Sequence, residues 1–160
     1  MIWTSSHNNC QTNKYKQYAI SGNRGKDGNY KGLCYPQLAP KLAFWKIWHE
    51  NIDKISEEEN NRYYIDQYYH QVLLSLEPIR VYEDLNNSIL LCYEDNNEFC
   101  HRHIVSAWLE IMLNIEVPEV IVNDLTMLQV ERPTYIKQFL LEIMQKEQPP
   151  KIFIKKDTSN

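Results

Sequence analysis

The sequence predicts a small α/β domain of Rossmann-like, three-layer type, in which a mainly parallel sheet is flanked by helices. Short apolar runs that are typical of buried strands alternate with longer segments of helical periodicity. Strands separated by helices favour a parallel α/β sheet over a helical bundle or a β-sandwich. The 160 residues fall within the size range of one domain, and a chain of this length buries roughly 70% of its unfolded surface on folding.

Four apolar runs predict the strands of the sheet. They lie at Met1–Thr4, Tyr18–Ser21, Ile89–Tyr93 and Val117–Val122. Each run is only a few residues long and is followed by polar or glycine-containing sequence, as expected of a buried strand. We therefore expect turns and loops directly after these positions.

Two helices are predicted between the second and third strands. The first begins at Pro40, because proline suits the first helical position. The face that we expect in its core carries Leu42, Trp45 and Trp48. The second begins at Ser56, which forms a capping-box signature with Glu59, and it continues until Pro78 stops the pattern. Its apolar positions are Ile65, Tyr68, Tyr69, Val72, Leu73 and Leu76.

Two further helices follow the third strand. One begins around Cys100, with Asn96 or Asn97 as its capping residue. Its apolar stripe consists of Ile104, Ala107, Trp108, Ile111 and Met112. The other runs from Pro133 to about Lys146, followed by a polar tail. Its inward positions are Ile136, Phe139, Leu140, Ile143 and Met144.

Composition limits the classes of function. The net charge of −4 and the calculated pI near 5.7 argue against an overall cationic nucleic-acid binder. The four cysteines form no CxxC pair and the chain does not open like a secretion signal, so we expect reduced thiols in a cytoplasm. The apolar runs are far shorter than the roughly 20 residues that span a bilayer, so no membrane segment is expected.

All four glycines lie in one stretch, SGNRGKDGNYKG, directly after the second predicted strand. Glycine permits close approach of a ligand to backbone N–H groups, and Arg24 and two lysines add positive charge. The stretch matches neither a Walker loop nor a dinucleotide fingerprint. One interpretation is an ordinary surface loop; the other is an anion site, whose candidate ligand-binding residues are Ser21, Gly22, Arg24 and Gly25.

The stretch LLCYEDNNEFCHRH concentrates reactive side chains where the third strand ends. Alternation along a strand places Cys92 and Glu94 on one face. The turn then brings Cys100 and His101 to the first turn of a helix, where the dipole favours anions and thiolates, and Arg102 could hold the same anion as a fork. The candidate catalytic residues are Glu94, Cys100 and His101, with Cys92 and Arg102 as ligand-binding candidates.

Three other interpretations of this stretch remain open. A zinc site would use Cys92, Cys100, His101 and His103, although the spacing lacks the short Cys and His pairs of structural zinc sites. A thiol nucleophile at Cys100 would need a histidine other than its neighbour, since successive helical side chains point about 100° apart. For the thiol nucleophile, the base would come from His7, His49 or His70.

In the purely structural interpretation, Cys92 is a small core residue, Glu94 caps a helix or pairs with Arg102, and His103 is solvated. Four polar or reactive groups at one strand–helix junction exceed what capping requires, which favours a functional site.

Three blocks resemble the bacterial domain of unknown function 488 family. They are YAISGNRG, YKGLCYPQLAPK at Tyr30–Lys41, and ILLCYEDNNEFCHRHIVSAWL at Ile89–Leu109. The third block resembles the family's signature, a strand that ends in Leu-Cys-x-Glu, followed by Cys-His-Arg before a helix. The resemblance implies a Rossmann-like domain over residues 1–122 with signature residues at the carboxyl edge of its sheet, and residues 123–160 would be a C-terminal helical extension and tail. It implies no particular reaction.

Together these features predict a pocket for a phosphorylated or nucleotide-like ligand, with N-glycosidic hydrolase or transferase chemistry as an extension. No cofactor is predicted, apart from the zinc alternative. The competing hypothesis is a non-catalytic binding protein that takes up a small molecule, a protein partner or a second copy of itself; nucleic-acid handling is a weaker third. The bias toward Asn, Lys, Ile and Tyr is typical of AT-rich bacterial or phage genomes.

Overall fold

A mainly parallel sheet organises the chain, and the computed structural model describes residues 1–22 and 30–147 of it. The central strands β1 (Ile2–Ser6), β5 (Ser88–Cys92) and β3 (Lys16–Ala19) run parallel and side by side. Outside them lie β4 (Leu33–Cys34) next to β3, and β6 (Glu119–Asn123) next to β1. Both β2 (Cys10–Gln11) and the antiparallel β7 (Met127–Val130) pair with β6.

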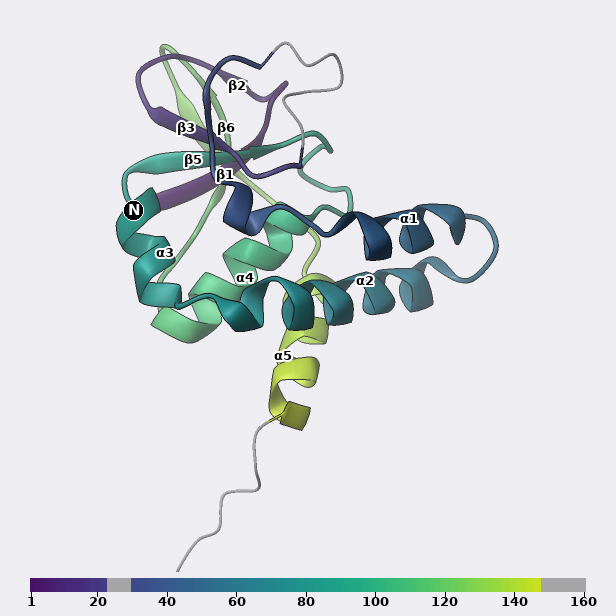
Figure 1. Cartoon of the computed structure of the whole chain (residues 1–160). Helices are drawn as coiled ribbons and strands as arrows, with labels where there is room; N and C mark the ends of the chain where they lie inside the picture. The colour runs from purple at the N-terminus through teal and green to yellow at the C-terminus, as the bar shows by residue number, and fades with distance from the viewer. Residues whose placement is uncertain (23–29, 148–160) are drawn as a thin grey trace, which may run out of the picture.

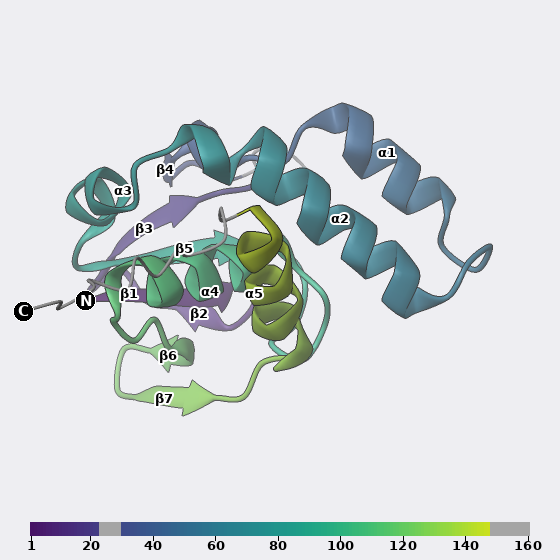
Figure 2. The same ribbon diagram turned by 90° about the horizontal axis from the view of Figure 1, so that it is seen from below.

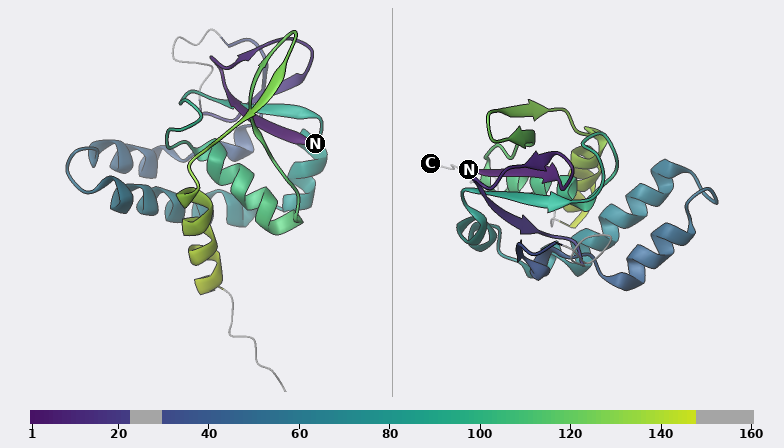
Figure 3. Two further views of the ribbon diagram at one scale, coloured as in Figure 1. Left: turned by 180° about the vertical axis from the view of Figure 1, so that it is seen from behind. Right: turned by 90° about the horizontal axis from the view of Figure 1, so that it is seen from above.

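Five α-helices flank this sheet on one side (Figures 1 and 2). They are α1 (Leu42–Glu50), α2 (Glu57–Gln71), α3 (Pro78–Leu85), α4 (His101–Leu113) and α5 (Tyr135–Glu147). Short 3-10 turns lie at Pro36–Leu38 and Leu73–Ser75. The view from above shows loops on the opposite face of the sheet (Figure 3). A smaller apolar cluster includes Cys10, Ile89, Leu91, Val120 and Val122. The predicted α/β class with a mainly parallel sheet is confirmed.

The capping box at the start of α2 forms as predicted. Ser56 is the N-cap, and its Oγ accepts a hydrogen bond from the backbone N–H of Glu59 at 3.1 Å. The prediction that one helix continues to Pro78 is wrong, because α2 ends at Gln71 and Pro78 instead begins α3. Proline lacks the N–H group that a first helical turn leaves unpaired, so it suits a start as well as a stop.

The cap predicted for α4 at Asn96 or Asn97 is also wrong. Cys100 is the N-cap, in extended conformation, and its side chain accepts no capping hydrogen bond. Side chains in the preceding loop make other hydrogen bonds. The Asn96 side chain donates to the carbonyl of Glu131, and Glu98 accepts from the backbone N–H of Asp95. The start of α4 is therefore set by tertiary contacts rather than by a local cap.

The helix hairpin of α1 and α2 extends past the edge of the sheet at which β1, β3 and β5 end (Figures 1 and 2). Only Phe44 of α1 is buried, and it packs edge-to-face on Tyr64 of α2. The predicted core face of α1 is wrong for two of its three residues, since Leu42 is 62% and Trp45 is 39% exposed, whereas Trp48 is half-buried and packs against the core. Trp48 adds further contacts with α2, because its indole N–H donates to Asn61 and its backbone carbonyl accepts from the Asn60 side chain.

A buried ion pair joins α4 to the sheet. Arg102 and Glu119 have no exposed side-chain surface, and Arg102 donates to Glu119 through Nε and Nη2 at 3.0 and 2.8 Å. Thr4 of β1 donates to the other carboxylate oxygen at 2.5 Å. The expectation of a solvated His103 is wrong: it is 1% exposed, and its Nδ1 lies 3.9 Å from Glu119.

The C-terminal helix α5 packs against α2 and α4. Of the positions predicted to face inward, Ile136, Phe139, Leu140 and Met144 are buried, and Ile143 is half-buried against the core. Within residues 1–22 and 30–147, no helix combines the length and apolar character that crossing a bilayer requires.

Replacing Glu119 with Ala should destabilise the fold by about 3–5 kcal/mol, because it leaves the Arg102 guanidinium buried without its counter-charge. Urea unfolding measures this change. The matched control is Glu142→Ala, which removes an exposed partner of Arg62 and should have little effect. Equal losses in the two variants would contradict the role given to the buried pair.

Folding stability should fall in acid because of His103. Burial first, and the charge of Arg102 second, lower the pKa of His103 to about 3, whereas an unfolded histidine titrates near about 6.5. Between these values only the unfolded state takes up the proton, so the free energy of unfolding decreases as the pH falls through this window.

His103→Phe should therefore lose less stability between about pH 6 and pH 4 than the parent protein, as measured by urea unfolding at each pH. The control is His70→Gln. A hydrogen bond to Glu147 raises the pKa of His70, so this group adds stability in acid, and its removal should make the acid loss steeper. A His103→Phe variant with the parent's pH profile would contradict this account.

Candidate functional site

A pocket of about 530 Å³ lies at the carboxyl edge of the sheet. Its walls come from the ends of β3 and β5, the start of α4, and the helix hairpin of α1 and α2. The lining residues are Ser21, Gly22, Pro40, Leu42, Trp45, Trp48, Tyr64, Cys92, Tyr93, Glu94, Phe99, Cys100 and His101. Ligands of open α/β sheets bind at this edge, because loops from several strands converge there.

One wall of the pocket is aromatic. Trp48, Tyr64 and Phe99 form a closed set of ring contacts, with centroids 5.3 to 5.7 Å apart. The indole N–H of Trp48 donates to Asn61 at 3.0 Å, which fixes the ring. Trp45 extends this wall and stacks on His49. A rigid aromatic surface of this kind suits the flat face of a conjugated ring.

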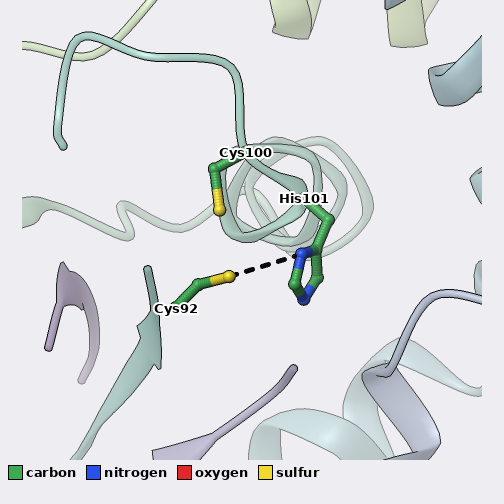
Figure 4. A group of neighbouring side chains, drawn as sticks. All are labelled: Cys92, Cys100 and His101. Atoms are coloured by element: carbon green, nitrogen blue, oxygen red, sulfur yellow. Dashed lines mark hydrogen bonds between the residues drawn. The ribbon is translucent and has the colours of Figure 1, made fainter. Parts of the chain in front are cut away.

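Two cysteines and a histidine form the floor. Cys92 is the last residue of β5, Cys100 caps α4, and His101 is the first residue of that helix. Their side chains converge (Figure 4), and Cys92 Sγ lies 3.5 Å from His101 Nδ1. The two sulfur atoms and a ring nitrogen all lie within 4.8 Å of one another. All three residues are buried.

The backbone carbonyl of Ile20 orients the imidazole of His101. His101 Nε2 lies 2.8 Å from this oxygen, and since a carbonyl only accepts, Nε2 carries the proton. In the neutral ring, Nδ1 then presents a lone pair to the sulfur atoms.

Cys100 and His101 interact although they are neighbours in sequence. The 100° argument against this pair fails, because Cys100 has φ −152° and ψ 145°, which is extended and not helical. Its side chain therefore does not follow the helical rotation. A base from elsewhere is not needed: His7 packs between Tyr30 and Tyr93, and His70 pairs with Glu147.

The pKa values of the floor residues shift in different directions. Burial alone would raise the pKa of the Cys100 thiol, but a hydrogen bond from Cys92 and the charges of Arg102 and His101 hold it well below its ordinary value. Burial likewise opposes the charge of His101, yet its interaction with Cys100 and the Ile20 carbonyl raises its pKa. The pKa of Cys92 is raised well above the ordinary value, mainly by burial.

Glu94 lies beside these sulfur atoms. Its Oε2 accepts from the Cys92 thiol at 3.5 Å, as alternation along the strand predicted. Burial, followed by the negative charge of Cys100, raises the pKa of Glu94 to about 7. A carboxyl group with such a pKa can both give and accept protons near neutral pH.

Several predicted site residues lie elsewhere. Arg102 does not line the pocket but pairs with Glu119, and it does not pair with Glu94 as the structural interpretation expected. The predicted zinc set is wrong in one member, since His103 faces Glu119 on the far side of the helix start and not the sulfur atoms. Ser21 and Gly22 do line the pocket. Arg24 and Gly25 lie outside the described residues.

The aromatic lining was missed from the sequence. Trp45 and Trp48 were assigned to the core because of their helical spacing. One signal could have revealed them: α1 has apolar residues on more than one face, which is more than packing against α2 can bury. Tyr64 was considered only as one of several tyrosines that could lie at an interface, because it is far from the signature block in sequence and meets Phe99 of that block only in the fold.

A family model covers most of the domain. Residues 9–113 match the model described as "Active DUF488-N3 subclade", DUF488-N3a. This range contains the floor residues, Glu94 and the aromatic wall, and it confirms the resemblance found in the sequence. No curated protein and no solved structure matches the chain. The chain belongs to the DUF488 family, within the DUF488-N3a subclade.

Proposed function

We propose that the protein is an enzyme that hydrolyses a carbon–nitrogen bond in a nucleotide-like ligand, with the N-glycosidic bond as the first candidate. One observation carries the proposal: Glu94 and the sulfur–imidazole floor lie in the same pocket as a wall of four aromatic rings. The wall suits a planar base, and the polar floor suits the reacting bond. The description of the matching family model as active is consistent with catalysis.

In this proposal Glu94 acts as the acid–base group. It accepts a proton from water, whose oxygen bonds to the carbon of the scissile bond. As the carbon–nitrogen bond breaks, the same proton passes to the departing nitrogen, so the site is restored. A carboxyl group suits this role because it lies at the pocket wall and accepts a hydrogen bond from Cys92.

The phosphate of a nucleotide would lie near the start of α4 and the segment after β3. Helix N-termini favour anions, and Gly22 leaves room: a Cβ built there meets no atom of the described residues within 4 Å. Because Gly22 also lines the pocket, a larger side chain at this position would intrude on the ligand.

A second mechanism is favoured by one contact, the pairing of Cys100 with His101. A thiol with an oriented imidazole beside it is the usual arrangement of a cysteine nucleophile. The Cys100 sulfur would then bond to the carbon as the carbon–nitrogen bond breaks, and the proton of the Cys100 thiol would pass through His101 to the departing nitrogen. Water would next break the sulfur–carbon bond, with its oxygen bonding to the carbon and one of its protons restoring the thiol. Single-turnover mass spectrometry separates the two mechanisms, since only this one leaves a covalent adduct on Cys100.

Ligand binding should depend on Trp45. In a thermal-shift panel of nucleotides, nucleosides and sugar phosphates, a nucleotide present at 100 times its Kd adds about 2.7 kcal/mol, which raises the melting temperature by roughly 5–10 °C. Trp45→Ala should weaken its binding roughly 5- to 150-fold, the amount that stacking on one base provides. Ile47→Ala, on the same helix but outside the pocket, should leave the affinity unchanged.

Gly22→Val should weaken the same ligand without lowering the melting temperature of the free protein, because it fills only the pocket. If no member of the panel shifts the melting temperature, or if Trp45→Ala and Ile47→Ala bind equally, the proposed pocket is wrong.

Turnover should depend on Glu94. With the nucleotide that binds best, Glu94→Gln should lower the release of free base, measured by chromatography, by about 10²- to 10⁴-fold while binding persists. Glu98→Gln changes an exposed carboxylate in the same loop and should keep full activity. A Glu94→Gln variant as active as Glu98→Gln would exclude Glu94 as the acid–base group.

A further inference from the structure

We propose that Cys92, Cys100 and His101 bind one zinc ion at the floor of the pocket. The site stands on the geometry of these three side chains and does not depend on which ligand the pocket takes. Thiolate and imidazole are the ligands that zinc prefers, and three protein ligands with one open position is the usual composition of a zinc site that acts on water.

The spacing of the donor atoms fits a single ion. With Zn–S near 2.3 Å and Zn–N near 2.0 Å, two ligands of a tetrahedral ion lie about 3.5 Å apart. Cys92 Sγ and His101 Nδ1 are separated by 3.5 Å, and the third donor atom, Cys100 Sγ, lies within 4.8 Å of both. Rotations of the Cys100 side chain about one bond can close that remaining gap.

The surroundings of His101 fit a metal ligand. Zinc-bound histidines almost always donate their second ring N–H to a carbonyl or carboxylate, which fixes the tautomer and the ring orientation. The Ile20 carbonyl does this at 2.8 Å and leaves Nδ1 unprotonated toward the sulfur atoms. In the neutral ring this is the tautomer that coordination through Nδ1 requires.

The two sulfur atoms favour a metal over a simple nucleophilic pair. A cysteine nucleophile needs one thiol and one imidazole, whereas a metal ion uses both sulfur atoms as ligands, and here the two sulfur atoms and the imidazole nitrogen lie within 4.8 Å of one another. Arg102, adjacent to His101, has a buried Nη1 without a hydrogen-bond partner among the described residues.

The open position of the zinc ion would face the pocket, since all three ligands belong to its lining. Water bound there would lie next to Glu94, whose carboxylate reaches Cys92. A zinc ion there would supply a Lewis acid that makes the bound water more acidic, and the Glu94 carboxylate would accept the proton that this water gives up. Glu94 is then the proton acceptor and not a ligand.

The experiment is metal analysis of the full chain purified without chelator, together with zinc titration against a competing chelator. We expect about one zinc per chain and an affinity in the nanomolar range or tighter. In the cobalt-substituted protein, thiolate-to-cobalt charge-transfer bands and intense visible bands should report a tetrahedral site. A parent protein that binds no zinc, or a cobalt form without thiolate bands, would overturn the proposal.

Substitutions assign the ligands. Cys92→Ser, Cys100→Ser and His101→Gln should each weaken zinc binding by at least roughly 100-fold. Cys10→Ser is the matched control, because Cys10 is also buried but belongs to the apolar cluster on the other face of the sheet. Circular dichroism identifies any variant that has failed to fold. In that case the thiolate bands of the cobalt-substituted parent protein decide whether cysteines bind the metal. Zinc binding that is equal in Cys100→Ser and Cys10→Ser would contradict the assignment.

Glu94→Gln separates this proposal from the proposed function. It should keep one zinc per chain and lose turnover. Loss of zinc in this variant would show a fourth protein ligand and overturn the open position. Zinc binding without any turnover in the parent protein would contradict the proposed hydrolysis and leave the metal site intact.

Discussion

The buried ion pair between Arg102 and Glu119 is the interaction on which the candidate site depends. It joins the first turn of α4 to β6, and Thr4 adds the central strand β1 to the same carboxylate. Neither charged side chain has any exposed surface, so each charge is stable in the core only with the other. The start of α4 is thereby held against the sheet, although Cys100 gives it no capping hydrogen bond.

This constraint explains how a loop of seven residues produces a defined site. Cys92 ends the central strand β5 and Cys100 precedes α4, and the ion pair holds the start of α4 against the sheet to which β5 belongs. Functional groups held by a strand end and a helix start keep their geometry better than groups within a loop. The carbonyl of Ile20, the residue that follows β3, also accepts a hydrogen bond from His101, which ties the start of α4 to the end of this strand.

Local signals in the sequence predicted the local parts of the fold. The apolar run at β5, the capping box at Ser56 and the inward face of α5 needed only neighbouring residues, and the structure has all three. Elements whose form depends on distant partners were not predicted. Pro78 could end or begin a helix, and the two-residue strands β2 and β4 carry too little pattern to be seen.

The candidate site divides in the same way. The sequence placed Cys92, Glu94, Cys100 and His101 together, since one short block carries them all. It could not place Arg102 and His103, because their burial follows from Glu119, a residue that no local pattern links to them. The aromatic wall escaped for a related reason: α1 meets the signature block only through the hairpin with α2.

The account joins an aromatic wall that suits a base with a sulfur, imidazole and carboxylate floor that suits a reaction. A crystal structure with the nucleotide that gives the largest thermal shift tests most directly whether the wall and the floor bind the same ligand. The account predicts density for the base against Trp45 and Trp48, with its bond to the sugar beside Glu94. Density for the nucleotide away from this pocket, with the wall and floor unchanged, would contradict it.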